Sequence, residues 1–243
     1  MPALVSLVNV VKSFGRGGKV LRVLDGISFD VGEEFIIILG PSGCGKSTLL
    51  RIIAGIEGVD EGEVRTSGNI VCGFVFQSPT LLPWLTVLDN VTLPLLAKGI
   101  NKREARERAL KYLSLVGLHG FEDFYPHELS GGMKQRVNIA RALVIEPTIL
   151  LMDEPFSQLD PLTAEALRAE ILDLWLSGVT TVRSIVMVTH NVEEAVLMAD
   201  KIITLTPRPA KISKIVEVRM PRPRDRRSKE FQEIVDMIYE YVS

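Results

Sequence analysis

Strongly apolar runs mark the core strands of this chain. They occupy Phe35–Leu39, Thr148–Met152 and Ser184–Val188. A strand without polar alternation is covered on both faces, which is typical of the parallel sheets of α/β proteins. Two later runs, Ile202–Leu205 and Ile212–Val218, predict further strands. The pattern therefore predicts an α/β fold with a mostly parallel core sheet.

The amino-terminal segment has shorter β-prone runs that are separated by glycine turns. Residues 3–11, Val20–Leu24 and Ile27–Val31 predict strands, with turns at Gly15–Gly18 and at Asp25-Gly26. Neighbouring strands joined by tight turns pair in antiparallel fashion. We therefore expect a small antiparallel β subdomain at the amino terminus.

Helical periodicity replaces the strand pattern after Ser78-Pro79. Residues 87–97 and Lys102–Val116 place apolar side chains at helical spacing, with charges on the outer face. Ser130 is a typical N-cap for a further helix that ends near Leu143. Strand patterns flank this region on both sides. We therefore expect an inserted helical lobe, residues 78–142.

The predicted core lobe consists of residues 1–77 and 143–218, within one domain that spans residues 1–243. Residues 219–243 predict a basic, proline-rich linker and an amphipathic helix. We interpret the linker as solvated chain, in preference to a segment that contacts anionic lipid headgroups.

Composition narrows the classes of function. The 243 residues carry a net charge of −2, so no basic surplus points to nucleic acid. The two cysteines, Cys44 and Cys72, cannot form a disulfide framework, and a reducing compartment fits them. No signal-peptide pattern begins the chain, and no apolar run approaches the roughly 18 residues that cross a bilayer. We expect any membrane role to depend on a partner protein.

A glycine-rich loop follows the first of the apolar runs. It reads Gly40, Pro41, Ser42, Gly43, Cys44, Gly45, Lys46, Ser47 and Thr48, which fits the pattern G-x-x-x-x-G-K-S. Its glycines let backbone N–H groups turn toward an anion, and the next helix adds its unpaired N–H groups. Lys46 is predicted to reach the β- and γ-phosphates, and Ser47 to bind Mg²⁺. The sequence therefore predicts a nucleoside triphosphate site. We interpret Cys44 as a loop-filling residue whose thiol pKa the helix start lowers, which would expose it to thiol reagents.

Polar residues also stand at the ends of other predicted strands, where ligands of open α/β sheets bind. They are Gln77, the pair Asp153 and Glu154, and His190. We expect Asp153 to hold Mg²⁺ directly or through water, and Gln77 to bind Mg²⁺ or the attacking water. Glu154 is a candidate to orient or deprotonate that water, and His190 to donate a hydrogen bond to the γ-phosphate.

A further segment, Leu129-Ser130-Gly131-Gly132-Met133, resembles the signature motif LSGGQ of ATP-binding-cassette (ABC) proteins. Other marks of that family occur in order along the chain: Gln77 as the Q-loop, Asp153-Glu154-Pro155 as the second Walker motif, Ser157–Asp160 as the D-loop and His190 as the switch histidine. The resemblance covers roughly residues 5 to 215. Because the motifs are ordered and each falls in its expected context, the resemblance is specific.

The resemblance implies a head-to-tail homodimer that sandwiches ATP and Mg²⁺. Each ATP would lie between the phosphate loop of one copy and the signature helix of the other. There Ser130, Gly131 and Gly132 would form a second anion site. Met133 stands where the family usually has glutamine, and this change leaves the phosphate donors intact.

The family also implies roles for single residues. Glu154 would be the general base, Asp160 would link the two nucleotide sites, and Phe14 would stack on adenine just after the first strand. These residues are all present, so we expect an active ATPase.

Several stretches look most like ATPases of importers for nitrate, sulfonates, taurine and bicarbonate. They are Leu82–Val87, the LSGGM form of the signature and Phe156–Trp175. This resemblance implies a separate membrane permease as partner, a solute-binding protein as an indirect partner, and no nucleic acid. It places the chain at the cytoplasmic face of the cell membrane, peripheral through the permease. The apolar segment Leu81–Leu85 would fit a groove for a short helix of the permease, and ordinary packing within the lobe is an equally good interpretation.

The alternative is a soluble ABC ATPase without a transport role, acting on nucleic acid or the ribosome. Such proteins usually carry long coiled-coil insertions or tandem cassettes. This sequence has a single phosphate-loop motif and no such insertion, so we favour the importer subunit.

Overall fold

A computed structural model describes residues 3–17 and 19–242. The chain forms two compact units. The first comprises the described residues up to Ile70 together with those from Arg183 onward, and the second comprises Val71–Val182. The predicted helical lobe, residues 78–142, falls within the second unit.

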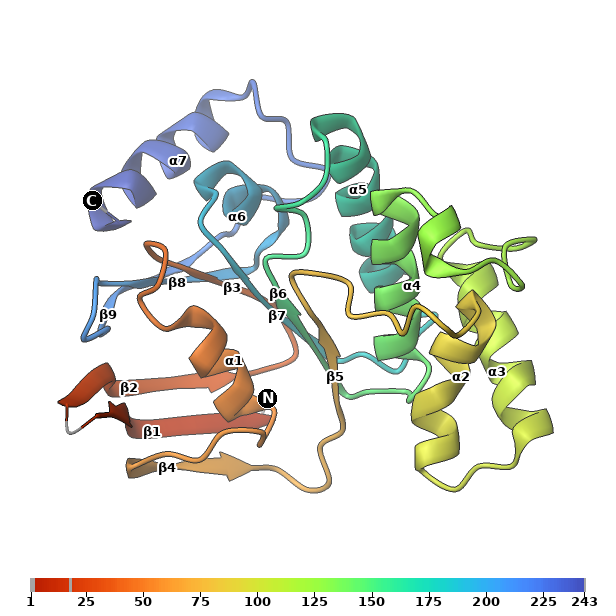
Figure 1. The fold of residues 1–243 in the computed structure, drawn as a ribbon. Helices are drawn as coiled ribbons and strands as arrows, with labels where there is room; N and C mark the ends of the chain where they lie inside the picture. Colours follow the sequence, from red (N-terminus) through yellow and green to blue (C-terminus); the bar gives the residue numbers. More distant parts are fainter. Residues whose placement is uncertain (1–2, 18, 243) are drawn as a thin grey trace. The chain divides into compact units, whose positions relative to one another are not determined.

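An antiparallel sheet opens the first unit (Figure 1). Its strands are β1 (Val5–Arg16), β2 (Lys19–Val31) and β4 (Glu61–Thr66), in the order β2-β1-β4. The antiparallel subdomain is confirmed, but the turn expected at Asp25-Gly26 is wrong. These residues lie inside β2, where the pairing with β1 shifts register and Gly26 has a φ of +72°. The glycine forms an irregularity within one long strand because it tolerates that backbone conformation.

Parallel strands form the core of the first unit. β3 (Phe35–Leu39) lies between β7 (Ser184–Thr189) and β8 (Lys201–Leu205), and both pairings are parallel. Strand β9 (Ile212–Glu217) pairs with β8 in antiparallel fashion. Every residue of β3 and β7 is buried, which explains their unbroken apolar sequences. The mostly parallel α/β fold is thereby confirmed.

Three helices pack on these strands. α1 (Lys46–Ile53) contacts β7, and α6 (Val192–Met198) contacts β3 and β7. α7 (Lys229–Val242) contacts α6, β8 and β9, and buries Phe231 and Ile238 completely. The predicted carboxyl-terminal helix therefore packs on its own unit.

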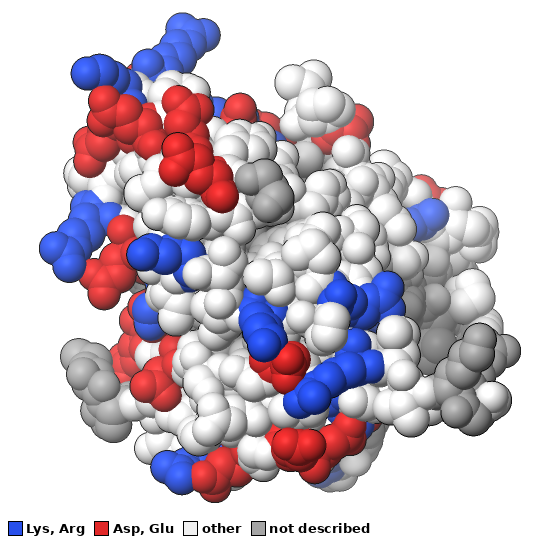
Figure 2. Space-filling model, turned by 90° about the vertical axis from the view of Figure 1, so that its left-hand side faces the viewer, with Lys and Arg blue, Asp and Glu red and all other residues white. Residues whose placement is uncertain are grey.

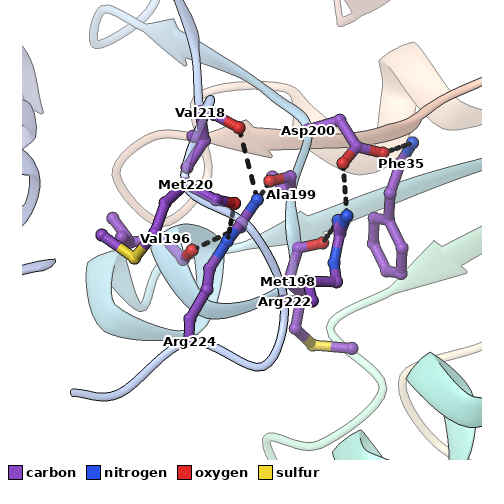
Figure 3. A network of polar contacts seen from close by, with 9 residues as sticks. All are labelled: Phe35, Val196, Met198, Ala199, Asp200, Val218, Met220, Arg222 and Arg224. Carbon is purple, nitrogen blue, oxygen red and sulfur yellow. Dashed lines mark hydrogen bonds and ion pairs between the residues drawn. The ribbon is translucent and has the colours of Figure 1, made fainter.

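The basic segment before α7 is not the solvated linker that its composition indicates. Arg224 is 8% exposed and donates to four backbone carbonyl oxygens, those of Val196, Ala199, Val218 and Met220 (Figure 3). Arg222 donates to the carbonyl oxygen of Met198 and to Asp200, whose carboxylate accepts from the backbone N–H of Phe35. Val196, Met198 and Ala199 lie at the end of α6, where carbonyl groups have no partner within the helix. The arginines bond these groups and tie the tail to α6 and β3.

The second unit is mainly helical. It holds two parallel strands, β5 (Cys72–Val75) and β6 (Ile149–Asp153). Its helices are α2 (Val87–Ala97), α3 (Lys102–Leu115), the 3-10 turn Pro126–Glu128, α4 (Gly131–Leu143) and α5 (Pro161–Ser177). Helix α4 contacts α2, α3, α5 and β5, so it is central to the unit (Figure 1).

Acidic and basic side chains are interspersed over the face drawn in Figure 2, in keeping with the small net charge. Within residues 3–17 and 19–242, no helix has the length and apolar character needed to cross a bilayer.

Candidate nucleotide-binding site

Three parallel strands of the first unit end at the same level. Leu39 of β3 is the register partner of Thr189 in β7 and of Thr204 in β8. The phosphate loop begins directly after Leu39, and His190 directly follows Thr189. The structure therefore brings the start of the phosphate loop and His190 to one edge of the sheet, as the strand pattern predicted.

Glycines give the phosphate loop its shape. Gly43 and Gly45 have φ values of +75° and +123°, in a region that side chains disfavour. A Cβ on Gly45 would lie 2.7 Å from Cγ1 of Val23 and 3.0 Å from Cδ2 of Leu24. The loop thus packs so closely against β2 that only glycine fits at position 45, directly before α1.

The start of α1 concentrates donors and positive charge at this loop. Gly45 is the N-cap residue, and no side chain among the described residues caps the helix start. Lys46 is 5% exposed, and its Nζ donates to the carbonyl oxygens of Gly40 at 2.8 Å and Pro41 at 3.1 Å. Ser47 and Thr48 follow in the first turn, half-buried. An uncapped helix start beside an ammonium group fits phosphate.

Cys44 is the exception to the expected chemistry of the loop. Its side chain is 2% exposed. Burial raises the pKa of the Cys44 thiol, and the nearby positive charge of Lys46 opposes this effect without cancelling it. The expectation of a lowered thiol pKa and of ready attack by thiol reagents is therefore wrong. Desolvation of the thiolate outweighs the helix start because the sulfur faces the protein interior.

Phe14 lies within β1 rather than after the first strand, because β1 continues to Arg16. Its side chain is 41% exposed. The Nζ of Lys12 lies 5.3 Å from the centroid of its ring, and Glu57 holds that ammonium group at 2.8 Å. An exposed ring with a cation fixed over one face is compatible with stacking of adenine on the other face, which stays a prediction.

The second unit places its own predicted residues at one strand edge. Val75 of β5 is the register partner of Met152 in β6, and Asp153 ends β6. Gln77 was expected at the end of a strand and lies two residues beyond the end of β5 at Val75. Asp153 is 8% exposed, and its carboxylate is the hard oxygen ligand that Mg²⁺ prefers.

A serine joins Gln77 to the turn that contains Glu154. The Nε2 of Gln77 donates to Oγ of Ser157 at 3.2 Å, and that hydroxyl donates to the carbonyl oxygen of Glu154 at 2.9 Å. Glu154 has a φ of +44°, a conformation that costs a non-glycine residue about 1–3 kcal/mol. Such strain persists where the surroundings fix it, and here Ser157 fixes it through both its N–H and its hydroxyl. The turn presents Glu154 in one defined conformation.

The signature segment forms the beginning of α4. Ser130 is its N-cap, and its Oγ accepts from the backbone N–H of Met133 at 3.3 Å. Ser130 and Gly131 are exposed, whereas Gly132 is buried. The Ser130 hydroxyl keeps its own hydrogen to donate. Serine and exposed amides at a helix start have the chemistry of an anion site.

Asp160 stands next to this segment. Its Oδ1 accepts from the backbone N–H of Thr163 at 3.0 Å and caps α5, and hydrogen bonds with Thr163 lower the pKa of the Asp160 carboxyl. A Cβ on Gly132 would lie 2.5 Å from Cγ2 of the same threonine. The signature helix and the helix that Asp160 caps are therefore in close contact within one chain.

Comparison with known proteins decides the family. A sequence model described as ABC transporter matches residues 24–157. The chain belongs to the ABC transporter family.

Individual relatives and solved structures agree. The chain is 49% identical over 240 residues to the ABC transporter ATP-binding protein MJ0412 of Methanocaldococcus jannaschii, covering 96% of this chain and 89% of the relative. It is 41% identical to the aliphatic sulfonates import ATP-binding protein SsuB of Bacillus cereus, covering 95% and 92%. The bicarbonate transport ATP-binding protein CmpD of Synechocystis is 42% identical, with 92% and 82% covered. Among solved structures, the ATP-binding cassette MJ0796 bound to ADP and Pi has a TM-score of 0.77 at 34% identity, covering 89% of this chain and all of that one. The prediction of an ATP-binding, ATP-hydrolysing cassette is confirmed.

Within this ABC cassette, α4 carries polar side chains that hold the segment around Gln77 and that the sequence pattern did not single out. Asn138, which is fully buried, donates through Nδ2 to the carbonyl oxygen of Phe76 at 2.9 Å. Arg141 donates to the carbonyl oxygen of Thr80 at 2.7 Å and to the Asn138 Oδ1 at 3.2 Å. The signature helix therefore holds both sides of Gln77. Buried polar residues in an apolar helix face were the available signal.

Proposed function

We propose that this chain is the ATP-binding and ATP-hydrolysing subunit of an importer, and that it energises uptake of a small solute through a separate membrane permease. The observation that carries the catalytic part is the phosphate loop, which leads into a helix start with the buried Lys46. The loop begins after Leu39, whose register partner Thr189 directly precedes His190. The importer part rests on relatives named for import of aliphatic sulfonates and of taurine, and on one named for bicarbonate transport. Their solutes share small size and a negatively charged group. We assign the same solute class here.

The proposal gives each residue a chemical task. Lys46 and the N–H groups of the loop bind the phosphates, and Ser47, Gln77 and Asp153 supply oxygen ligands to Mg²⁺. When bound, Mg²⁺ neutralises charge on the phosphates. No group of three carboxylate, imidazole or thiol side chains that would hold a metal alone occurs in the described part of the chain.

Hydrolysis would follow from the remaining groups. Glu154 accepts the proton of the attacking water, and His190 donates a hydrogen bond to the γ-phosphate. Ser130, Gly131 and Gly132 of a second copy would complete the site, with Asp160 linking the two sites of a head-to-tail homodimer. Support comes from the anion-site chemistry of the start of α4 and from the dimeric structures of MJ0796.

Attachment to the membrane would occur through the permease at its cytoplasmic face. A solute-binding protein would be an indirect partner. The side chain of Trp84 is 70% exposed in the segment Leu81–Leu85 and offers apolar surface for a short permease helix. The names of the relatives favour this importer over a soluble ABC ATPase acting on nucleic acid or the ribosome.

The testing experiment reconstitutes the chain with its permease and binding protein in lipid vesicles, and measures ATP hydrolysis and solute uptake. We expect uptake of a sulfonate, taurine or bicarbonate that requires ATP. Glu154→Gln is expected to lower hydrolysis about 100-fold or more while ATP binding is retained. Glu107→Gln, an exposed acid on α3, is the matched control. Hydrolysis by Glu154→Gln at the rate of the unmodified chain would refute the general base. Hydrolysis of ATP by the reconstituted complex without uptake of any small anion would refute the solute class.

A further inference from the structure

The loop between β8 and β9, residues 206–211, lies against the phosphate loop. Its approach begins in the sheet, because Thr204 of β8 is the register partner of Leu39. A Cβ on Gly40 would lie 3.1 Å from Cβ of Leu205 and 3.3 Å from its carbonyl oxygen. The chain therefore leaves β8 in contact with the first residue of the phosphate loop.

Backbone hydrogen bonds fix both ends of this β8–β9 loop. The N–H of Ala210 donates to the carbonyl oxygen of Val23, and the N–H of Asp25 donates to the carbonyl oxygen of Ala210, each at 2.9 Å. The N–H of Thr206 donates to the carbonyl oxygen of Lys211 at 2.9 Å, which closes the loop. The segment that carries Arg208 is thus held by β2, the same strand that packs on Gly45.

Arg208 lies at the tip of this fixed loop and faces the phosphate loop. Its Nη2 is 3.3 Å from the position that a Cβ on Gly43 would occupy. No hydrogen bond or ion pair joins Arg208 to another residue in the described part of the chain, and its side chain is exposed. The charge of Arg208 also acts on a buried group of the loop. Burial raises the pKa of the Cys44 thiol, and the charges of Lys46 and Arg208 both oppose that rise.

We propose that Arg208 is a further residue of the nucleotide site, whose guanidinium group binds the phosphates of the nucleotide held in the phosphate loop of the same chain. A guanidinium without a carboxylate partner is matched to phosphate oxygens, with planar N–H donors that a lysine lacks. Its placement on a loop fixed to β2 holds the charge at the site before the nucleotide arrives. This inference rests on the proposed assignment of the phosphate loop as the nucleotide site.

The test compares Arg208→Ala, Arg208→Lys and Lys211→Ala with the unmodified chain. Lys211 is the matched control, since it lies in the same loop but its charge pairs with Asp25 at 3.2 Å. Calorimetry would measure binding of AMP, ADP and the non-hydrolysable ATP analogue AMP-PNP, each with Mg²⁺. We expect Arg208→Ala to bind AMP-PNP about tenfold more weakly, with a smaller loss for ADP and almost none for AMP. Arg208→Lys should recover part of the affinity, and Lys211→Ala should bind within about twofold of the unmodified chain.

The outcomes distinguish phosphate binding by Arg208 from a packing role of the β8–β9 loop. Equal losses of affinity for all three nucleotides, or for Lys211→Ala as much as for Arg208→Ala, would mean that the loop acts only through packing, and would overturn the proposal. Unchanged AMP-PNP binding by Arg208→Ala would also overturn it. If the unmodified chain itself bound no AMP-PNP, the phosphate-loop assignment would fail instead. Thermal unfolding of each variant identifies any loss of folded protein, and Arg208→Lys keeps the test valid if the alanine variant is unstable.

Discussion

Leu39 of β3 and Thr189 of β7 are register partners in parallel strands, and each is the last residue of its strand. Their pairing means that Gly40 and His190 begin their loops side by side. Asn191 then caps α6, with its Oδ1 accepting from the N–H of Glu194 at 3.1 Å. The position of His190 is therefore fixed on one side by a buried strand and on the other by a helix cap.

The first prediction concerns His190. Replacing His190 with alanine removes the hydrogen-bond donor proposed for the γ-phosphate, so we expect kcat for ATP hydrolysis to fall about 100-fold. Binding of AMP-PNP should stay within about twofold, because the phosphate loop is untouched. His119→Ala is the control, since its side chain is 87% exposed and lies on the second unit. Equal kcat values for both histidine variants would contradict the assignment.

Sequence patterns predicted the fold well where local chemistry alone determines structure. The strands β3 and β7 are buried along their whole length, so their sequences need no alternation. The phosphate loop was readable because its glycines satisfy local backbone requirements, as Gly43 and Gly45 show. Ser130 capped its helix as its residue type predicts.

Features that depend on contacts between distant parts of the chain could not be predicted from local sequence patterns. Arg224 lies in a basic, proline-rich stretch that is typical of solvated chain, but its acceptors at the end of α6 lie up to 28 residues away. The pKa of Cys44 depends on how deeply the folded loop is buried. The role of Asn138 requires knowing that Phe76, 62 residues earlier, lies beside it. Composition cannot report such pairings.

The second prediction tests the link between α4 and Gln77. Asn138→Ala would leave the buried carbonyl oxygen of Phe76 with a weaker donor, that of Gln135 at 3.5 Å. We expect the free energy of unfolding to fall by about 1–3 kcal/mol. We also expect kcat to fall while AMP-PNP affinity is retained, because the residue after Phe76 is Gln77. Urea unfolding and steady-state hydrolysis measure the two effects.

Lys134→Ala on the same helix is the control for Asn138, because the Lys134 side chain forms no hydrogen bond or ion pair with another described residue. Loss of stability without any change in kcat, measured well below the unfolding temperature, would mean that Asn138 acts only in packing.

The third prediction concerns Arg224. Burial lowers the pKa of Arg224 to about 10, so the guanidinium is still charged at neutral pH. Arg224→Met would leave four carbonyl oxygens without this donor, and we expect the free energy of unfolding to fall by about 3 kcal/mol. Arg219→Met is the matched control from the same segment. Its side chain is 88% exposed and, among the described residues, pairs with Glu217 alone, so the urea midpoint should stay close to that of the unmodified chain. Similar urea midpoints for the two variants would refute the structural role of Arg224.

The fourth prediction uses the contact between the signature helix and α5. A Cβ on Gly132 would lie 2.5 Å from Cγ2 of Thr163, and the next atom, Cβ of the same residue, is 3.9 Å away. Gly132→Ala should therefore destabilise the chain by about 1–3 kcal/mol through this one clash. Thr163→Ser removes Cγ2 and keeps the hydroxyl beside Asp160.

Because alanine is a better helix former than glycine by about 1 kcal/mol, the double variant Gly132→Ala/Thr163→Ser should recover most or all of the stability lost by Gly132→Ala alone. A double-mutant cycle from urea unfolding should give a favourable coupling of about 1 kcal/mol or more between the two positions. ATP hydrolysis by the double variant reports on the site itself. If hydrolysis recovers together with stability, Gly132 is required because it lets α4 pack closely on α5. If stability recovers and hydrolysis does not, the small size of Gly132 serves the nucleotide directly, as the anion-site assignment requires.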